Sequence, residues 1–399
     1  MNSEKPRLLR KAAPSGESFF APCPRGLAPA LAEELAALGA LRPQPADAGV
    51  AFTGPFDLVY TANLRSRIAS RILWRVARFP YANENDIYGA AREVRWRELF
   101  AVERTFKVET NAHRSPVKSL DFVTLRVKDA IADHFRDATG SRPSVSARDP
   151  DVRVHAFLDA RECTLYVDTS GEPLFKRGRR EHVGEAPLKK NLAAGILHLA
   201  GWKPGMPLLD PMCGAGTFLS EAADMSLARA AGRERDFGFR NLARFEAPRW
   251  ERLHAAALRE QKPLGLLPIY GSDLLGRSVE QARRNLQDAG LEGAVTFKQA
   301  NLLELSAPAA HGMLVTNPPY GVRLGEKERL AEFYPVLGDA LKQRFAGWTA
   351  FIFSGDPELA KRIRLHPSRK TVLFNGALEC RLYEYRMVAG GNRARAAER

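Results

Sequence analysis

Apolar and polar positions in the C-terminal half of the chain alternate between two periods. Short, mostly apolar runs precede stretches in which apolar residues recur every three or four positions, as on one face of a helix. This pattern predicts strands at the start of 207–223 and in 268–273, 295–305, 312–321 and 348–355, and helices in 188–202, 277–290 and 328–345. Alternating strands and helices are typical of a doubly wound, mostly parallel α/β sheet.

The first part of the chain, 18–80, also mixes helices and strands. The pattern predicts a helix over 27–40, a strand over 49–54 and a long helix over 58–79. One face of that long helix is apolar, and the adjacent face carries a stripe of arginines, Arg67, Arg71, Arg75 and Arg78. Such a stripe is either a solvated helix face or an edge that follows the phosphates of a nucleic acid.

Residues 81–170 form a second α/β segment, which contains no glycine-rich phosphate loop. We predict a strand over 105–112, a helix over 119–140 and a hairpin of two strands over 152–160 and 163–171. These features indicate a compact accessory module rather than a catalytic one. The expected order is therefore a basic tail, two accessory modules, a linker, a catalytic domain and a second tail, at 1–17, 18–80, 81–170, 171–187, 188–388 and 389–399.

The linker is dense in cations, which include Lys176, Arg177, Arg179 and Arg180. Its position between an accessory module and the catalytic domain favours contact with nucleic acid over a merely solvated segment.

Composition narrows the classes of function. The chain has 399 residues, 45% of them hydrophobic, and a formal net charge of +14, which favours a polyanionic partner. The sequence contains no run of about 18 apolar residues, so no membrane-spanning helix is predicted. The basic N-terminus is not followed by the apolar stretch that a secretory signal requires. The cysteines are far apart, so we predict neither a metal site nor disulfides and expect a reducing cytoplasm.

Three predicted strands end in candidate ligand-binding residues, at the edge where doubly wound sheets bind ligands. Asp210 opens the turn DPMCGAGT, whose glycines let a ligand approach the backbone closely. This spacing is not the G-x-G-x-x-G fingerprint, so a nicotinamide dinucleotide is disfavoured. Asp273 ends the second strand, where a carboxylate can accept both hydroxyls of a ribose. Asn301 follows the third strand, where it either holds an adenine or lies in an ordinary turn.

The tetrapeptide Asn317-Pro318-Pro319-Tyr320 is the most specific motif. Two prolines directly after a strand prevent the strand from continuing. The Asn317 side-chain oxygen and the Pro318 carbonyl can then accept both hydrogens of one exocyclic amino group, drawing its nitrogen towards a tetrahedral, nucleophilic geometry. Tyr320 offers a flat face on which the base can stack. The motif therefore predicts chemistry at a base amino nitrogen without a dedicated general base.

These residues resemble the class I S-adenosylmethionine (SAM)-dependent methyltransferases that modify amino nitrogens of bases. DPMCGAGTFLSEAA and TNPPYGVRLGE, with RSRIASRIL, LRVKDAIADHF and KRGRR upstream, are similar to guanine-N2 RNA methyltransferases with an N-terminal THUMP domain, above all those of 23S rRNA. The resemblance runs from about Phe19 to Tyr385. It implies a Rossmann-like methyltransferase domain preceded by a ferredoxin-like subdomain and a THUMP RNA-binding domain.

The resemblance implies roles for the matching residues. SAM would be held by Asp210, Pro211, Cys213, Gly214, Gly216, Thr217, Asp273, Asn301 and Leu302. The target guanine would be held by Asn317, Pro318, Pro319 and Tyr320. RNA would be contacted by Arg67, Arg71, Arg75, Lys176, Arg177, Arg179 and Arg180. Asn301 departs from the family, which usually has Asp at this position.

The resulting hypothesis is methylation of guanine N2 in RNA, in the first place 23S rRNA, by a cytoplasmic monomer. Three alternatives remain open: a tRNA guanine-N2 methyltransferase of the same architecture, an adenine-N6 methyltransferase, and a catalytically silent RNA-binding protein of ribosome assembly. A polar and aromatic stretch at about 225–262 lengthens the connection between Asp210 and Asp273. We expect its aromatic residues and arginines to shape the RNA entrance.

Overall fold

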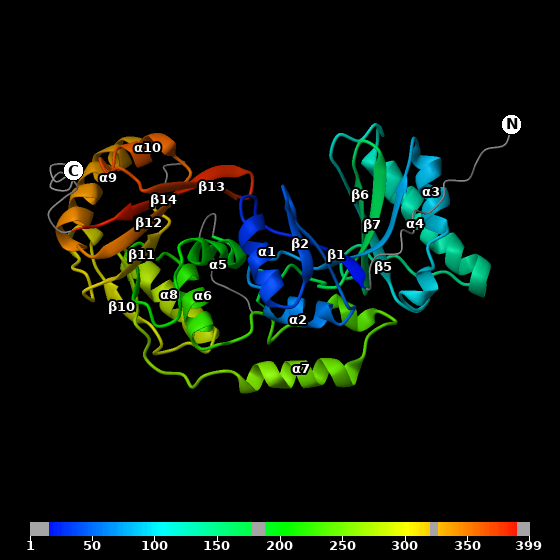
Figure 1. Cartoon of the computed structure of the whole chain (residues 1–399), viewed down its shortest axis with the longest axis horizontal. Coiled ribbons are helices and arrows are strands. Elements are labelled where there is room, and N and C mark those ends of the chain that lie inside the picture. The colour runs from blue at the N-terminus through cyan, green and yellow to red at the C-terminus, as the bar shows by residue number, and fades with distance from the viewer. Residues whose placement is uncertain (1–15, 178–187, 320–325, 389–399) are drawn as a thin grey trace. The chain divides into compact units, whose positions relative to one another are not determined.

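The computed structural model describes residues 16–177, 188–319 and 326–388 (Figure 1). The chain divides into two compact units. Unit 1 comprises Met1–Pro22, Ala32–Leu174 and Glu234–Ala256, and unit 2 comprises Cys23–Leu31, Phe175–Arg233 and Ala257–Arg399. Each unit thus includes a segment from the part of the sequence that mainly builds the other. Within the described ranges, no helix has both the length and the apolar character that a membrane crossing requires.

Unit 1 is built on a seven-stranded sheet in the order β2-β3-β1-β4-β7-β6-β5. Its strands are antiparallel except for the pair β5 and β6. They are β1 Glu17–Pro22, β2 Leu41–Ala46, β3 Gly49–Gly54, β4 Leu73–Pro80, β5 Phe106–Ala112, β6 Val152–Leu158 and β7 Glu162–Asp168. The helical segments between these strands are α1 Ala28–Ala37, α2 Leu58–Arg65, α3 Glu84–Arg92, η1 Trp96–Glu98 and α4 Leu120–Thr139. The start of α1, as far as Leu31, belongs to unit 2. Figure 1 shows α3 and α4 on one side of β5, β6 and β7.

Helix α4 and the β6–β7 hairpin form as the sequence predicts. Ser119 caps α4, because its side chain accepts the N–H of Phe122 at 3.2 Å. Gly140 ends the helix with a left-handed φ of 71°, which glycine adopts at little cost. Between these caps the helix buries Val123, Val127 and Ile131 against the sheet.

The prediction of one long helix over 58–79 is wrong. Helix α2 ends at Arg65, and the chain continues as strand β4 from Leu73. The cause is Glu34 of α1, a half-buried residue whose carboxylate accepts the Ser66 hydroxyl at 2.6 Å and the backbone N–H of Arg67 at 2.7 Å. These bonds satisfy backbone groups of an extended turn, so the helix can end although the side-chain pattern continues.

Unit 2 contains a second seven-stranded sheet, in the order β10-β9-β8-β11-β12-β14-β13. The parallel strands are β8 Leu208–Asp210, β9 Ile269–Asp273, β10 Thr296–Gln299, β11 Gly312–Thr316 and β12 Trp348–Ser354. An antiparallel hairpin that the sequence analysis did not predict, β13 Arg369–Asn375 and β14 Leu378–Arg386, completes the edge. The doubly wound, mostly parallel sheet is confirmed.

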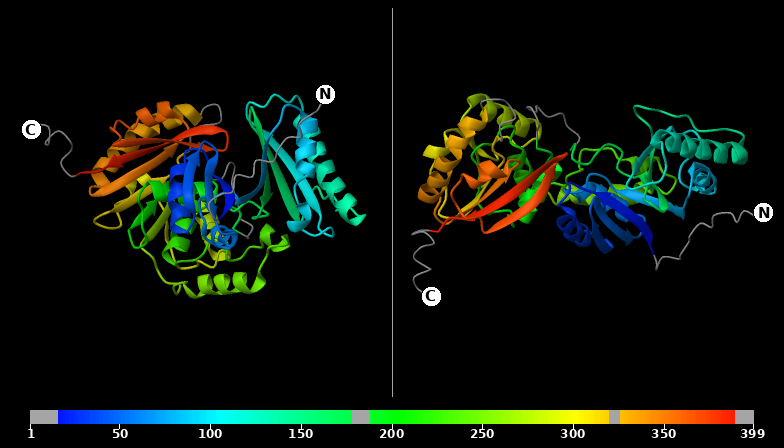
Figure 2. Two further views of the ribbon diagram at one scale, coloured as in Figure 1. Left: turned by 45° about the vertical axis from the view of Figure 1, so that its right-hand side comes forward. Right: turned by 90° about the horizontal axis from the view of Figure 1, so that it is seen from above.

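Helices lie on both faces of this sheet. They are α5 Lys190–Leu199, α6 Thr217–Ser226, α8 Gly276–Asp288, α9 Glu326–Arg344 and α10 Pro357–Lys361, with the short turn η3 Leu302–Glu304. Figure 1 and Figure 2 show α9 and α10 on one face and α5, α6 and α8 on the other. The core beneath α9 contains Leu314, Leu341, Trp348 and Ile352, each at most 1% exposed.

The stretch at 225–262 does not have the structure that the sequence analysis expected. Its residues 234–256 belong to unit 1 and include η2 Gly238–Asn241 and most of α7 Ala247–Arg259. Phe237, Phe239 and Trp250 are at most 3% exposed, and Phe239 and Trp250 pack on Tyr60 with ring centroids 4.9 and 6.3 Å away. These aromatic residues are core residues of unit 1, so they do not form an RNA entrance.

Candidate active site

Most of the predicted cofactor residues come together at the carboxyl edge of the parallel sheet in unit 2. β8 lies between β9 and β11, so Asp210 at the end of β8 is flanked by the end of β9, Asp273, and by Asn317, which follows β11. The chain runs from β8 outward to β9 and β10 and then returns to the other side of β8. Such a switch point is where open α/β sheets bind ligands.

The loop between β8 and α6 depends on its glycines. Gly214 and Gly216 have left-handed φ values of 51° and 78°. A Cβ at Gly216 would lie 3.1 Å from Cβ of Ala282, so this glycine lets α8 pack closely. A Cβ at Gly214 would meet no described atom within 4 Å. The backbone of Gly214 therefore borders open space, as close approach of a ligand requires.

Asp273 holds two loops. Its Oδ2 accepts the N–H of Gly214 at 3.1 Å, and its Oδ1 accepts the N–H of Leu275 at 3.0 Å, where α8 begins. Each carboxylate oxygen has a second lone pair, so the group can still accept ribose hydroxyls. Leu274 and Leu275 are 61% and 47% exposed and provide apolar surface directly after this carboxylate.

Asp210 is a buried carboxylate, only 2% exposed. Burial raises the pKa of Asp210 from 3.8 to about 7 and the nearby Asp273 carboxylate adds to this rise, while the N–H of Met212, 3.3 Å away, opposes it. A cation beside Asp210 would stabilise the ionised form. A positively charged group bound beside Asp210 would therefore lower the pKa of this carboxyl.

Asn317, Pro318 and Pro319 leave the sheet as the prolines predict. β11 pairs with β12 as far as Thr316 and Ile352, and the pairing ends there. Pro318 is buried, Asn317 is half-buried and Pro319 is exposed. Tyr320, predicted to stack on the base, lies outside the described residues.

The remaining predicted cofactor residues differ in their surroundings. Asn301 caps η3, because its Oδ1 accepts the N–H of Leu303 at 3.1 Å. Leu302 is 3% exposed and belongs to the core beneath α9. Pro211 and Cys213 are buried in the loop after β8, and Thr217 is the first residue of α6. Asn301 therefore has the local role in a turn that was one of its two predicted alternatives. The packing role of the Leu302 side chain was not predicted.

The arginine stripe predicted for RNA does not form, because Arg67, Arg71 and Arg75 do not share a helix. Arg67 lies in the turn held by Glu34. Arg71 forms an ion pair with buried Asp168 and also donates to the Gly171 carbonyl. Arg75, in β4, donates to the Ser18 hydroxyl at 2.8 Å. These contacts give Arg71 and Arg75 roles within the fold of unit 1.

The linker arginine Arg177 is also buried. Its Nε and Nη2 donate to the two carboxylate oxygens of Glu221 in α6, each at 3.1 Å, and the two side chains are 6% and 1% exposed. This bidentate pair attaches the start of the linker to the helix that follows the glycine loop. Lys176 is exposed, and Arg179 and Arg180 lie outside the described residues.

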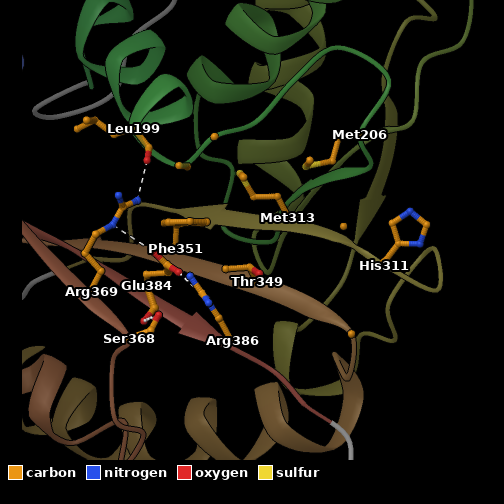
Figure 3. Close-up of a pocket in the computed structure, with 14 residues that line it drawn as sticks. Leu199, Met206, His311, Met313, Thr349, Phe351, Ser368, Arg369, Glu384 and Arg386 are labelled. Atoms are coloured by element: carbon orange, nitrogen blue, oxygen red, sulfur yellow. Dashed lines mark hydrogen bonds and ion pairs between the residues drawn. The ribbon is translucent and has the colours of Figure 1, made fainter. Parts of the chain in front are cut away.

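The opposite, amino-terminal edge of the same sheet holds a cavity of about 690 Å³ (Figure 3). Glu384 accepts Nε of Arg386 at 2.9 Å and lies 3.1 Å from Nε of Arg369, and Arg369 donates to the Leu199 carbonyl at 2.7 Å. Helix C-termini attract cations, so Arg369 fastens the β13–β14 hairpin to the end of α5. None of the described residues predicted for the active site lines this cavity. No motif in the sequence marks this cluster.

Family models match most of the chain. The model of the RMKL-like methyltransferase domain matches residues 177–384, that of the THUMP domain residues 81–168, and that of the RlmL ferredoxin-like domain residues 18–73. The first of these alone covers about half of the chain and includes all the described residues of the site.

Individual proteins show the same similarity. The chain is 39% identical to "Putative RNA methyltransferase slr0064" of Synechocystis over 370 residues, 92% of this chain and 96% of that protein. It is 41% identical to "Ribosomal RNA large subunit methyltransferase K/L" of Syntrophotalea carbinolica over 92% of this chain, but spans only 53% of that relative's length. The solved structure titled "SMU.472, a putative methyltransferase complexed with SAH" superposes with a TM-score of 0.86 at 28% identity, covering 95% of this chain and all of that one. The chain therefore belongs to the family of RMKL-like, SAM-dependent methyltransferases, with ferredoxin-like and THUMP domains ahead of a class I methyltransferase domain.

Proposed function

We propose that the chain transfers the methyl group of SAM to N2 of a guanine in RNA, most specifically in 23S rRNA. The observation that carries the proposal is that Asn317-Pro318-Pro319 follow the end of β11, beside the carboxyl end of β8 and one strand away from that of β9. The names of the Synechocystis and Syntrophotalea relatives, together with the THUMP domain, favour RNA as the substrate.

The residues around β8 and β9 suit SAM. Asp273 would accept the ribose hydroxyls, and the exposed Leu274 and Leu275 would border the adenine. Gly214 borders the open space that the methionine part would enter. The buried carboxylate of Asp210 suits the positive charge of the cofactor. When bound, SAM supplies an electrophilic methyl group on its sulfonium.

Asn317 and Pro318 would activate the acceptor. The lone pair of a guanine amino group is conjugated with the ring, so the group is a weak nucleophile. Accepting both amino hydrogens, at Asn317 Oδ1 and at the Pro318 carbonyl, draws the nitrogen out of conjugation and orients its lone pair. Orientation of this kind can supply several kcal/mol of the barrier, roughly 7–11 kcal/mol at most. The target base must be unpaired or flipped out to reach the site, and Tyr320 would then stack on it.

The N-terminal modules would hold the RNA, with the chain acting as a cytoplasmic monomer. The net charge of +14 favours a polyanion. A duplex part of the substrate would be recognised by its A-form backbone rather than its sequence. The predicted contacts at Arg71, Arg75 and Arg177 are not part of this proposal, because these side chains are engaged within the protein.

The experiment that tests the proposal is methylation of separated RNAs. Purified protein is incubated with labelled SAM and 23S rRNA, 16S rRNA or tRNA from a strain lacking the gene, and the nucleosides are identified by mass spectrometry. N2-methylguanosine in 23S rRNA alone is the expected result. N2-methylguanosine in tRNA alone would identify tRNA instead of rRNA as the substrate. N6-methyladenosine would refute guanine as the target. Cofactor binding without any transfer, to naked RNA or to precursor particles, would indicate a non-catalytic RNA-binding protein.

A further inference from the structure

Unit 2 also contains a cavity of about 230 Å³ between α10 and the β13–β14 hairpin. All of its lining residues belong to this unit, and α10 lies on the same face of the sheet as α9 (Figure 1). The connection from α10 into β13, 361–370, borders the cavity and contains five lysines and arginines but no acidic residue. We call this cavity the α10 pocket, and its polar lining consists of Lys361, His366, Lys370, Arg381, Tyr383 and Tyr385.

The strands of the hairpin direct alternate side chains to the two faces of the sheet. Arg381, Tyr383 and Tyr385 are two positions apart in β14 and therefore share one face. Lys370 of β13 pairs with Tyr383, so it lies on that face too. Arg369, which lines the cavity at the amino-terminal edge, lies on the opposite face. The α10 pocket therefore has its own set of side chains, separate from those of the other cavity.

The lining of the α10 pocket is positively charged and includes no carboxylate among the described residues. Lys370 forms no ion pair with any described residue. Lys361 pairs with Glu358 at 2.6 Å and Arg381 with Glu379 at 3.3 Å, but these four side chains are between 40% and 72% exposed. Exposed ion pairs contribute little, so another anion can take the place of these carboxylates.

Two tyrosines add neutral hydrogen-bond donors to these cations. Tyr383 and Tyr385 are 5% and 1% exposed, and their stacked rings have centroids 6.4 Å apart. Burial raises the pKa of both hydroxyls, although Arg381 opposes this rise at Tyr383. The hydroxyls therefore stay protonated and can donate a hydrogen bond. Cations beside hydroxyl donors suit an anion with several oxygens, such as a phosphate group.

The pairing of the strands places this pocket close to the NPPY motif. Tyr383 pairs with Ile352 of β12, which pairs with Thr316 of β11, directly before Asn317. Tyr383 is thus two strands away from the end of β11, which is about 10 Å at the usual spacing of strands. Arg381 lies two residues nearer to the carboxyl edge of the sheet. At about 3.4 Å of rise per stacked nucleotide, 10 Å corresponds to about three nucleotides.

We propose that the α10 pocket binds one backbone phosphate of the substrate RNA, within about three nucleotides of the target base. Lys370 and Arg381 would supply most of the attraction. Phosphate contacts fix the register and orientation of a nucleic acid without reading its sequence, so this contact would align the strand that delivers the base. The inference rests on the proposed function in taking RNA as the substrate and Asn317 as the residue that holds the base.

The first test measures RNA binding to the full chain by fluorescence anisotropy. The probe is a labelled single-stranded RNA of about 12 nucleotides with one central guanine, at several salt concentrations. Lys370→Ala with Arg381→Ala should weaken binding about tenfold. It should also reduce the salt slope by about 0.7, the value for one phosphate of a single strand. The matched control, Lys203→Ala with Lys342→Ala, removes two exposed lysines of unit 2 that do not line the pocket, and should have little effect.

The second test identifies the phosphate that is bound. Each linkage of the probe is replaced in turn by an uncharged methylphosphonate, which removes one negative charge. In the wild type, one linkage within about three nucleotides of the guanine should cost about tenfold in affinity. The same replacement should cost the double alanine variant nothing further, because the cations that bind this phosphate are already gone. A general attraction to RNA would instead spread the loss evenly over the linkages.

Conservative variants separate this role from misfolding. Lys370→Arg with Arg381→Lys keeps both charges and should bind RNA as the wild type does. SAM affinity, measured by calorimetry, should be unchanged in every variant of the α10 pocket.

Three outcomes would overturn the proposal. They are wild-type RNA affinity in the double alanine variant, a methylphosphonate series without one sensitive linkage, and RNA binding that micromolar inorganic phosphate weakens about tenfold. The last of these would assign the pocket to a free phosphate. Neither test requires methyl transfer, so failure of the proposed function, seen as the absence of N2-methylguanosine, is distinguishable from failure of this inference.

Discussion

The backbone N–H of Gly214 donates to Oδ2 of Asp273 at 3.1 Å, which joins the loop after β8 to the end of β9. One carboxylate therefore shapes the glycine loop and stands where the cofactor ribose would bind. The second oxygen of Asp273 accepts the N–H of Leu275, so the start of α8 depends on the same side chain. Loss of this carboxylate would remove the support of two loops together with the proposed contact to the ribose.

Asp273→Ala should weaken SAM binding by roughly 10–100-fold, since hydrogen bonds to a charged group contribute about 1.5–3 kcal/mol. Asp273→Asn keeps one side-chain oxygen and should lose less. Isothermal titration calorimetry measures both, with Glu280→Gln on the exposed side of α8 as the control. Wild-type affinity in the alanine variant would show that Asp273 does not hold the cofactor.

Asp210→Asn should stabilise the protein and impair cofactor binding. With a folded-state pKa of about 7 against 3.8 for an ordinary aspartate, the folded chain holds a proton that the unfolded chain has lost between these pH values. Stability contributed by this group is therefore fully present below pH 3.8 and is lost as the pH rises towards 7. Asparagine does not titrate, so it adds no pH dependence of this kind. The free energy of unfolding of the variant should therefore exceed that of wild type by about 1–3 kcal/mol at pH 8.

Urea denaturation between pH 4 and 8 tests the stability part of this prediction, and the advantage of the variant should grow with pH. Calorimetry tests the binding part. Wild-type affinity for SAM should rise from pH 6 to 8 as Asp210 ionises, because the ionised form attracts the cationic cofactor. The asparagine variant should bind weakly, with little pH dependence. Parallel stability curves for the two proteins would contradict the elevated pKa.

Asn317→Ala should lower the rate of methyl transfer by about 100-fold or more, the usual effect of removing one group that stabilises a transition state. SAM affinity should stay at the wild-type value, because the side chain would contact the acceptor base rather than the cofactor. Single-turnover transfer to 23S rRNA with saturating SAM measures the effect. Wild-type rates in this variant would refute the proposed role of Asn317.

The sequence predicted unit 2 well because its elements follow local rules. The strand–helix alternation, the glycine loop after Asp210 and the end of pairing at Pro318 each depend on residues within a few positions of one another. The fold of α4 could be predicted for the same reason, since both of its caps, Ser119 and Gly140, adjoin it in the chain.

Two of the errors concern interactions between residues far apart in the sequence, whereas the β13–β14 hairpin, which was also missed, is a local element. Helix α2 ends because of Glu34, 32 positions before Ser66, and no local pattern encodes that contact. The burial of Phe239 and Trp250 on Tyr60 likewise joins distant residues. Aromatic side chains in a polar stretch could either form a surface that binds RNA or pack into the core of another part of the protein. The composition of the stretch does not distinguish these cases.

Trp250→Ala should destabilise unit 1 by about 3–5 kcal/mol, although its sequence position lies between the strands of the catalytic sheet. Removal of the ring leaves a cavity beside Tyr60 and Phe239 that the surrounding aromatic residues cannot fill. Denaturation followed by hydrogen exchange measures which unit loses protection. Leu258→Ala, a 44% exposed position in α7, is the control and should have little effect. Loss of protection confined to β8–β12 would contradict the assignment of Trp250 to unit 1.

Variants of Arg177 test whether this cation of the basic linker binds RNA or stabilises the fold. Arg177→Met leaves Glu221, 1% exposed, without its bidentate partner, and should cost about 3–5 kcal/mol of stability. The double variant Arg177→Met with Glu221→Met replaces the pair by apolar groups and should recover most of this loss. In that recovered protein the salt dependence of RNA binding should equal that of wild type, because the guanidinium faces a carboxylate of α6 rather than a phosphate. A salt slope reduced by about one in the double variant would instead return Arg177 to the RNA interface.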